Sequence, residues 1–203
     1  MKSLKARPGR PRAFDEKAAL DQAMNVFWRK GYDATSVADL TTAMGINPPS
    51  LYAAFGNKES LFLRVLERYA EGPAAFVTKA LAAPTAREVA ERRLYGAVDA
   101  LRDSSRPPGC LVIQAAVRGG DSTDSISGKL SSFCEMAHQA FVQRFRRAKA
   151  EGDLSKNADP VTLARYLNTV AQGIAIQAAA GATRAELRKV VAVALQPWPA
   201  AKK

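Results

Sequence analysis

The sequence predicts an all-α fold, with a three-helix N-terminal domain followed by a larger helical C-terminal domain. Apolar residues recur at intervals of three and four along most of the chain, as on one face of a helix. Helix-capping residues precede these segments, and Gly or Pro follows them. No segment has the alternating apolar and polar pattern of a half-buried strand. The 203 residues are 47% hydrophobic and 24% charged, which is typical of a globular protein.

The first twelve residues are predicted to form a flexible basic arm. Pro8, Gly9 and Pro11 prevent a regular helix there. The arm has no acidic residue and carries the basic side chains Lys2, Lys5, Arg7, Arg10 and Arg12.

Residues 13–72 are predicted to form the N-terminal domain. Asp15 can cap a first helix that ends at Gly31, and Ser36 can cap a second that ends at Gly45. A third helix begins after Asn47, where two prolines occupy the first turn, at which a missing N–H costs little. A fourth, longer helix is expected over 57–70 and ends at Gly72 and Pro73. We place the domain boundary at that break.

Residues 73–197 are predicted to form the C-terminal domain, and 198–203 a tail. The sequence Thr85-x-x-Glu88 is typical of a capping box at a helix start. A short segment over 110–118 precedes a long amphipathic helix that runs from Ile126 to about Ala148. Two last helices are expected over 160–180 and 184–196, and both are rich in alanine.

The formal charge of +11 and a pI near 10 indicate a polyanionic partner. Nucleic acid is the first candidate, and an acidic membrane surface is the second. No run approaches the roughly 20 apolar residues that a membrane-spanning helix requires, and no apolar stretch follows the basic N-terminus. We therefore expect no membrane partner and a cytoplasmic location.

The residues of an enzyme active site or metal centre are missing from the sequence. There is one histidine, and there is no Gly-rich phosphate loop or nucleophile elbow. The two cysteines are too few for a disulfide framework and lack the spacing of a zinc site. We expect no catalytic activity, no cofactor and no bound metal.

Residues 36–55 have the pattern of a helix-turn-helix, in which the second helix enters the DNA major groove. That second helix begins with the small or polar groups Asn47, Pro48, Pro49 and Ser50, which suit contact with bases. A plain αα-hairpin inside a core is the alternative. The basic arm and Lys58, at the start of the next helix, favour DNA binding because both can reach phosphates.

The same region closely resembles the TetR/AcrR family of transcriptional regulators. The resemblance covers residues 14–66 without a gap. It rests on Gly31-Tyr32-Asp33-Ala34-Thr35-Ser36, Met44-Gly45-Ile46, Ser50-Leu51-Tyr52, Phe55 and Asn57-Lys58-Glu59-Ser60-Leu61. It implies a repressor that a small-molecule or reactive effector releases from a palindromic operator.

The resemblance also implies roles for individual residues. Thr35 and Ser36 would contact phosphates, and Tyr52 and Lys58 would clamp them. Asn47, Pro48, Pro49 and Ser50 would lie against base edges. The segment with Arg7, Arg10 and Arg12 is similar to the family's basic leader. Ala53 and Ala54 depart from the larger or polar residues of other members, so contact with thymine methyl groups would carry part of the readout.

The family architecture implies a homodimer, with residues 160–196 of two chains pairing in a four-helix bundle. The alanine-rich faces of these helices independently allow close packing. A sequence-tolerant architectural DNA-binding protein is the alternative that charge alone permits. The long C-terminal part argues against it, because such proteins rarely need a large body.

The effector site is predicted only as a set of candidates between the C-terminal helices. Core packing explains these residues equally well. The apolar candidates are Phe133, Met136, Phe141 and Tyr166, and the polar ones are Gln114, His138 and Gln172. Cys110, after Pro108-Gly109, could be a reactive thiol or a buried small side chain. Cys134 and His138 lie four residues apart and could form a redox or metal-sensing pair or a packed face.

Overall fold

The computed structural model describes residues 15–100, 106–117 and 124–199. These residues form ten helices and no strand, so the predicted all-α fold is confirmed. The basic arm, with Arg7, Arg10 and Arg12, lies outside the described residues.

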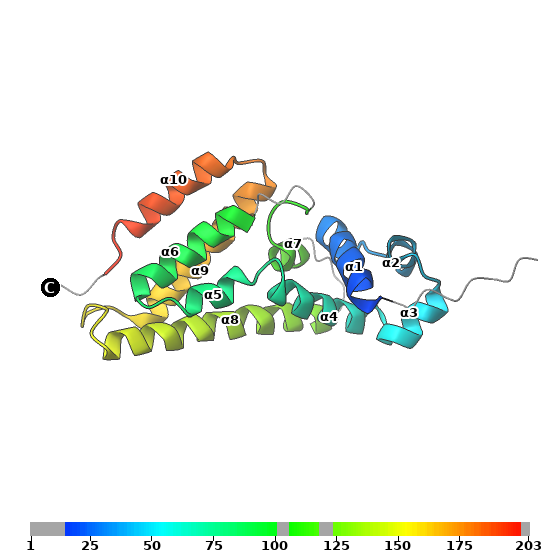
Figure 1. Cartoon of the computed structure of the whole chain (residues 1–203), viewed down its shortest axis with the longest axis horizontal. Coiled ribbons are helices and arrows are strands. Elements are labelled where there is room, and N and C mark those ends of the chain that lie inside the picture. The colour runs from blue at the N-terminus through cyan, green and yellow to red at the C-terminus, as the bar shows by residue number, and fades with distance from the viewer. Residues whose placement is uncertain (1–14, 101–105, 118–123, 200–203) are drawn as a thin grey trace, which may run out of the picture.

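Four helices form a compact head at one end of the molecule (Figure 1): α1 (Glu16–Lys30), α2 (Val37–Met44), α3 (Pro48–Phe55) and α4 (Lys58–Glu71). Each begins at the predicted cap, where a side-chain oxygen accepts a hydrogen bond from a main-chain N–H of the first turn. The caps are Asp15, Ser36, Asn47 and Asn57. Gly45 ends α2 with φ +66°, a left-handed conformation that favours glycine.

Six helices form the body: α5 (Phe76–Leu81), α6 (Ala86–Asp99), α7 (Leu111–Val117), α8 (Asp124–Ala150), α9 (Pro160–Ala179) and α10 (Arg184–Leu195). Helix α8 runs along the length of the body, from beside α4 to the end farthest from the head (Figure 1). The sequence analysis did not predict α5. This helix has six residues and follows Ala75, which offers no side-chain cap.

The apolar core of the head also contains side chains from the body, which follow the end of α4 at Gly72 in the sequence. Phe27, Leu40, Leu51 and Phe62 are at its centre. Side chains from α7 and the first turns of α8 complete it: Leu111, Val112, Ala115, Ile126 and Leu130. The head is therefore packed against the body through α7 and α8 as well as joined to it by the chain.

A second core joins α6, α8, α9 and α10 in the body. Phe141 and Phe145 of α8 are fully buried there, with Leu94 of α6 and Leu167 of α9. Trp198 packs edge-on against Phe145, with ring centroids 5.5 Å apart, and is only 7% exposed. The segment predicted as a tail therefore begins with a core residue.

Gly96 is required where α5 crosses α6. A Cβ atom at this position would lie 2.6 Å from Cδ2 and 3.1 Å from Cβ of Phe76. We predict that Gly96→Ala destabilises the fold by about 1–3 kcal/mol, because overpacking outweighs the better helix propensity of alanine. Gly128→Ala in α8 is the control, since its Cβ would meet nothing within 4 Å. That change should be neutral or stabilise by up to about 1 kcal/mol. Urea unfolding measures both, and equal effects would contradict the assignment.

Candidate nucleic-acid interface and ligand cavity

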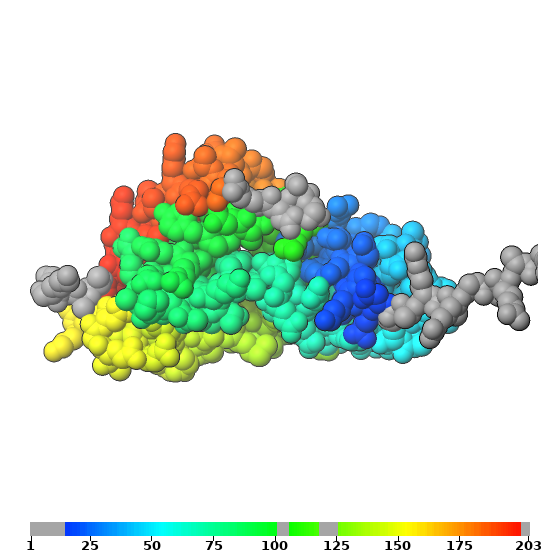
Figure 2. Space-filling model, in the orientation of Figure 1, coloured from blue at the N-terminus to red at the C-terminus, as the bar shows by residue number. Residues whose placement is uncertain are grey.

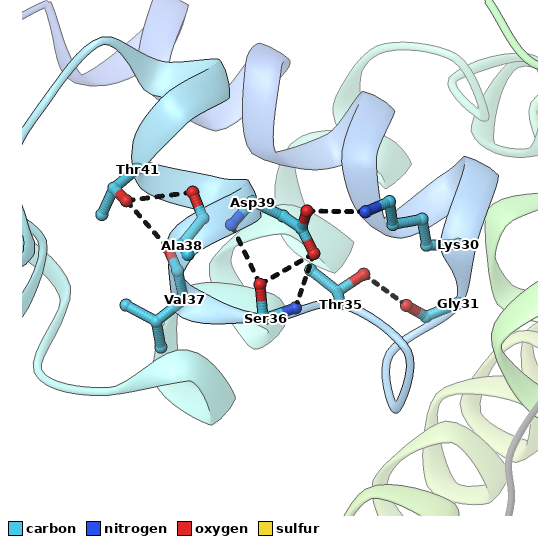
Figure 3. Close-up of polar contacts among 8 residues, drawn as sticks. All are labelled: Lys30, Gly31, Thr35, Ser36, Val37, Ala38, Asp39 and Thr41. Atoms are coloured by element: carbon cyan, nitrogen blue, oxygen red, sulfur yellow. Dashed lines mark hydrogen bonds and ion pairs between the residues drawn. The ribbon is translucent and has the colours of Figure 1, made fainter.

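The N-terminus of α2 is fixed by a reciprocal capping box (Figure 3). The main-chain N–H of Asp39 donates to Oγ of Ser36 at 3.0 Å, and the Ser36 N–H donates to Oδ2 of Asp39 at 3.0 Å. Nζ of Lys30 at the end of α1 lies 2.6 Å from Oδ1 of Asp39. The bond from Lys30 and those from Ser36 hold the pKa of Asp39 well below its usual range. The carboxylate stays ionised and ties α2 to α1.

Thr35 is placed differently from what the resemblance implied. Its side chain is 1% exposed, and its hydroxyl donates to the carbonyl oxygen of Gly31 at 2.6 Å (Figure 3). A phosphate contact by this hydroxyl does not fit that placement, because both the side chain and its hydrogen are already engaged. Thr35 instead closes the turn between α1 and α2 and so positions the exposed Ser36.

The start of α3 has the arrangement expected of a recognition helix. Leu51 and Phe55 face the core of the head, which fixes the rotation of α3. The opposite, exposed side presents Asn47, Pro48, Pro49 and Ser50, together with Tyr52, which is half exposed. Oδ1 of Asn47 accepts the Ser50 N–H at 2.9 Å. Among the described residues nothing accepts from the Asn47 side-chain amide, which leaves both of its donors available for a base edge.

Lys58 is held at the N-terminus of α4, where the helix dipole disfavours a positive charge. Its Nζ lies 4.3 Å from the centre of the Tyr32 ring, and partial burial lowers its pKa. A phosphate at this position would meet both the ammonium group and the free N–H groups of the first turn. Ser36, the start of α3 and Lys58 thus all lie in the head, at the N-terminal ends of α2, α3 and α4.

A cavity of about 320 Å³ lies in the body where α4 to α9 meet. Five of the predicted effector residues line it: Cys110, Phe133, Met136, Phe141 and Gln172. Met136 is 66% exposed, so the cavity reaches the surface beside this residue. The cavity is therefore both enclosed by apolar side chains and accessible to a small molecule.

Three predicted effector residues do not line this cavity. The Tyr166 hydroxyl donates to the carbonyl oxygen of Ala194 at 2.9 Å, so this side chain joins α9 to α10. His138 is buried, and its Nδ1 lies 3.4 Å from Nδ2 of Asn168. Gln114 lies on α7 but is not one of the lining residues. For these residues the sequence suggested a place between helices but not which side of the helix meets the cavity.

Four polar residues of the cavity were missed in the sequence: Tyr69, Thr78, Arg93 and Asn168. Arg93 of α6 has a buried Nε and no hydrogen-bond or ion-pair partner among the described residues. Tyr69 of α4 donates its hydroxyl hydrogen to Sγ of Cys110 at 3.3 Å, and burial raises the pKa of its hydroxyl well above the usual value. Arg93 stands three residues after the buried Ala90 and four after Val89, a spacing that could have identified it on the inner face.

Cys110 and Cys134 are both free thiols that line this cavity. Burial raises the pKa of the Cys134 thiol. Within the described ranges no group of three or more His, Cys, Asp and Glu side chains could hold a metal ion. The pairing of Cys134 with His138 as metal ligands therefore finds no third ligand in the part of the chain that is described.

Comparison with known proteins gives the family. The profile "Bacterial regulatory proteins, tetR family" matches residues 19–65, and "Tetracyclin repressor-like, C-terminal domain" matches residues 90–198. The chain belongs to the TetR family. The HTH-type transcriptional repressor ComR of Escherichia coli (strain K12) is 35% identical over 97% of this chain and 94% of its own. BdcR from the same organism, another HTH-type transcriptional repressor, is 58% identical over 62 residues, 30% of this chain and 32% of its own.

A solved TetR-family structure covers nearly the whole chain. This is a cysteine mutant of the regulator CifR in complex with a 26-base-pair double-stranded operator. It is 42% identical and has a TM-score of 0.86, over 94% of this chain and 100% of that chain. TetR proteins are DNA-binding transcriptional regulators and not enzymes. The family therefore confirms the predicted DNA-binding function and the expectation that the protein is not an enzyme. None of the described helices is long and apolar enough to cross a membrane.

The buried bond of Thr35 can be tested separately from DNA contact. We predict that Thr35→Val lowers the free energy of unfolding by about 1 kcal/mol, because the Gly31 carbonyl oxygen loses its hydroxyl donor. Thr41→Val is the control, because the Thr41 hydroxyl donates only to the carbonyl oxygens of Val37 and Ala38 in its own helix, α2. Thermal unfolding measures both. A Thr35→Val protein of unchanged stability but weak DNA binding would instead make Thr35 a direct contact.

Proposed function

We propose that this chain is a homodimeric repressor that binds a palindromic operator and is released from it by a molecule bound in the body cavity. The observation that carries the proposal is the exposed polar start of α3 on a TetR-type helix-turn-helix. The names of ComR and BdcR as repressors, and the operator complex of CifR, support it.

In the proposed complex α3 enters the major groove and α2 crosses the DNA backbone. Ser36, Tyr52 and Lys58 would contact phosphates, which fix the position of the head without reading sequence. Asn47 and Ser50 would read base edges, while Pro48, Pro49 and Ala53 would make apolar contacts. The basic arm, with Arg7, Arg10 and Arg12, would add contacts to phosphates or the minor groove.

The proposed dimer forms through α9 and α10, over residues 160–196. Large apolar side chains remain exposed on both helices: Val161 and Ile176 on α9, and Val190 and Val193 on α10. Gly173 and Thr169 lie exposed between the apolar positions of α9 and allow a second helix to approach closely. Helix α10 stands at the surface of the body (Figure 2), where a second chain can reach it.

Helix α4 is the element that would connect the cavity to DNA. Its Leu61 and Phe62 are in the core of the head, while Tyr69, near its other end, lines the cavity. An ion pair between Lys129 and Glu59 also ties α8 to the start of α4. A dimer reads half-sites about 34–36 Å apart, so a pivot of α4 near Gly72 and Pro73 would misplace both recognition helices.

A reactive effector is the second candidate for release. Cys110 supports it, because the thiol lines the cavity and accepts a hydrogen bond from Tyr69. If release depends on thiol chemistry, Cys110→Ser will abolish it. If release depends on noncovalent binding, the variant will still respond.

The proposed operator is tested by selecting bound sequences from a random double-stranded library with the full chain. A palindrome whose half-sites are one helical turn apart is the expected result. Binding without any sequence preference would instead favour an architectural DNA-binding protein.

We predict two classes of effect from variants of the head. Tyr52→Ala and Lys58→Ala should weaken binding to operator and random DNA alike, and Lys58→Ala should reduce the salt dependence by about one ion, because one phosphate is no longer neutralised. Asn47→Ala and Ser50→Ala should change the preferred sequence. Lys79→Ala, an exposed lysine of α5, is the matched control. Fluorescence anisotropy at several salt concentrations measures these effects. A changed base preference in Lys58→Ala at full general affinity would refute the assignment.

We predict that Val193→Glu converts the dimer to a monomer and sharply weakens operator binding. The substitution places two carboxylates near the proposed twofold axis, whereas Val193 is 62% exposed in one chain, so the monomer should still fold. Val117→Glu, at a valine of α7 that is 70% exposed, is the matched control. Analytical ultracentrifugation gives the association state. A wild-type monomer at micromolar concentration that still binds operator would refute the dimer.

A further inference from the structure

We propose that the cavity recognises an organic monoanion, a carboxylate with an apolar body, and that Arg93 binds its acid group. This inference rests on the proposed function, in which the cavity is the effector site. It adds the chemical class of the ligand, which the family does not determine.

Arg93 is a cation whose hydrogen-bond donors have no acceptor among the residues that the structure describes. Nothing in the described ranges accepts a hydrogen bond from its guanidinium, and its Nε is shielded from solvent. The group lies over two aromatic rings, 5.5 Å from the centre of Phe76 and 5.9 Å from that of Phe141. These rings hold the guanidinium in place but do not use its N–H groups. A carboxylate would accept two of them in a planar, bidentate pair.

The charges around the cavity favour an anion and limit it to one negative charge. No Asp or Glu occurs among the described lining residues, and Arg93 is the one Lys or Arg among them. Loss of hydration in this partly buried position lowers the pKa of Arg93. A neutral ligand would leave this partly buried charge unpaired, whereas a dianion would bring one charge without a partner.

The rest of the cavity suits an apolar body. Phe76, Val77, Leu81, Ile113 and Phe133 contribute hydrocarbon walls. The volume of about 320 Å³ is near the lower end of the roughly 300–1,000 Å³ found for ligand pockets. Asn168 and Gln172 of α9 add amide groups that can donate to a second carboxylate oxygen. A medium-sized acid fits this combination better than a bare inorganic anion, which would bury none of the apolar wall.

The test compares acids with alcohols of the same skeleton. Octanoate and 4-phenylbutanoate are titrated into the full-length protein by calorimetry, beside octan-1-ol and 4-phenylbutan-1-ol. We expect at least one acid to bind about tenfold or more tightly than its alcohol, since a hydrogen bond to a charged group strengthens binding by that factor or more. Arg93→Met should remove the difference, while Arg92→Met should keep it. Arg92, on the same helix, pairs with Glu88 at 2.9 Å and does not line the cavity.

The comparison remains decisive if Arg93→Met folds poorly. Met matches the unbranched side chain of Arg as far as Nε, and removing a partly buried charge is expected to leave stability unchanged or raised. Arg93→Lys provides a second variant that keeps the charge but cannot form the bidentate pair. It should retain a smaller preference for the acid. The acid-to-alcohol ratio of the wild-type protein needs no variant at all. A ratio near one for both skeletons, or an acid affinity unchanged in Arg93→Met, would overturn the proposal.

Operator binding, measured with the same compounds, separates this inference from the proposed function. Acid binding that depends on Arg93 but leaves operator affinity unchanged would support the anion site and refute the effector role of the cavity. Alcohols that bind as tightly as acids and release the operator would support the effector role and overturn anion recognition. Where an acid does release DNA, operator must weaken its binding by the same factor, because the coupling is reciprocal.

Discussion

The packing of α4 against α1 is the interaction on which the rest of this molecule depends. Phe62 of α4 meets Phe27 of α1 edge-on, with ring centroids 4.9 Å apart, and Tyr69 meets Trp28 in the same way at 5.1 Å. The ion pair of Arg68 with Asp21 lies over this contact but is partly exposed, so the apolar contact provides most of the stability. Because α3 is fixed to the same core by Leu51, any movement of α4 is transmitted to the recognition helix.

Completion of the head core by the body follows from the size of the head. A unit of about 60 residues buries too little of its surface to be more than marginally stable. Leu111 and Val112 of α7 and Ile126 and Leu130 of α8 provide the missing apolar area. The head therefore cannot be regarded as an independent module on a flexible linker. Segments that line the cavity, such as the turn at Cys110, also support the core of the head, and this shared use physically connects the cavity to the DNA-binding helices.

Local interactions account for what the sequence could predict. The caps at Asp15, Asn47 and Thr183 are bonds between residues three apart, so the residue types alone reveal them. Helix α5 has no such cap and is held by contact with α6 around Gly96, which no local pattern records. The cavity depends on how helices distant in sequence meet. For that reason five candidates lining it were found together with Tyr166, which faces α10, while Arg93 was missed because a charged residue breaks the apolar pattern of its helix face.

Comparison with Arg144, the buried arginine of α8, shows why the partly buried Arg93 is better explained by a ligand than by the fold. Arg144 of α8 donates through one terminal nitrogen to the carbonyl oxygens of Ala83 and Pro84, both at 2.9 Å, and so holds the turn between α5 and α6. This bond gives the burial of Arg144 a role in the fold, although its Nε and Nη1 have no partner among the described residues. Arg93 fixes no such turn within the described residues, although its position in α6 could hold an apolar residue at lower cost. Local rules are most often broken at functional sites. A cation placed on an apolar wall, with its Nε unpaired among the described residues, destabilises the empty cavity relative to one that holds an anion. That difference favours the conformation of α4 and α6 that best encloses the ligand, and it gives a bound acid a means of shifting the head that a neutral molecule of the same shape would lack.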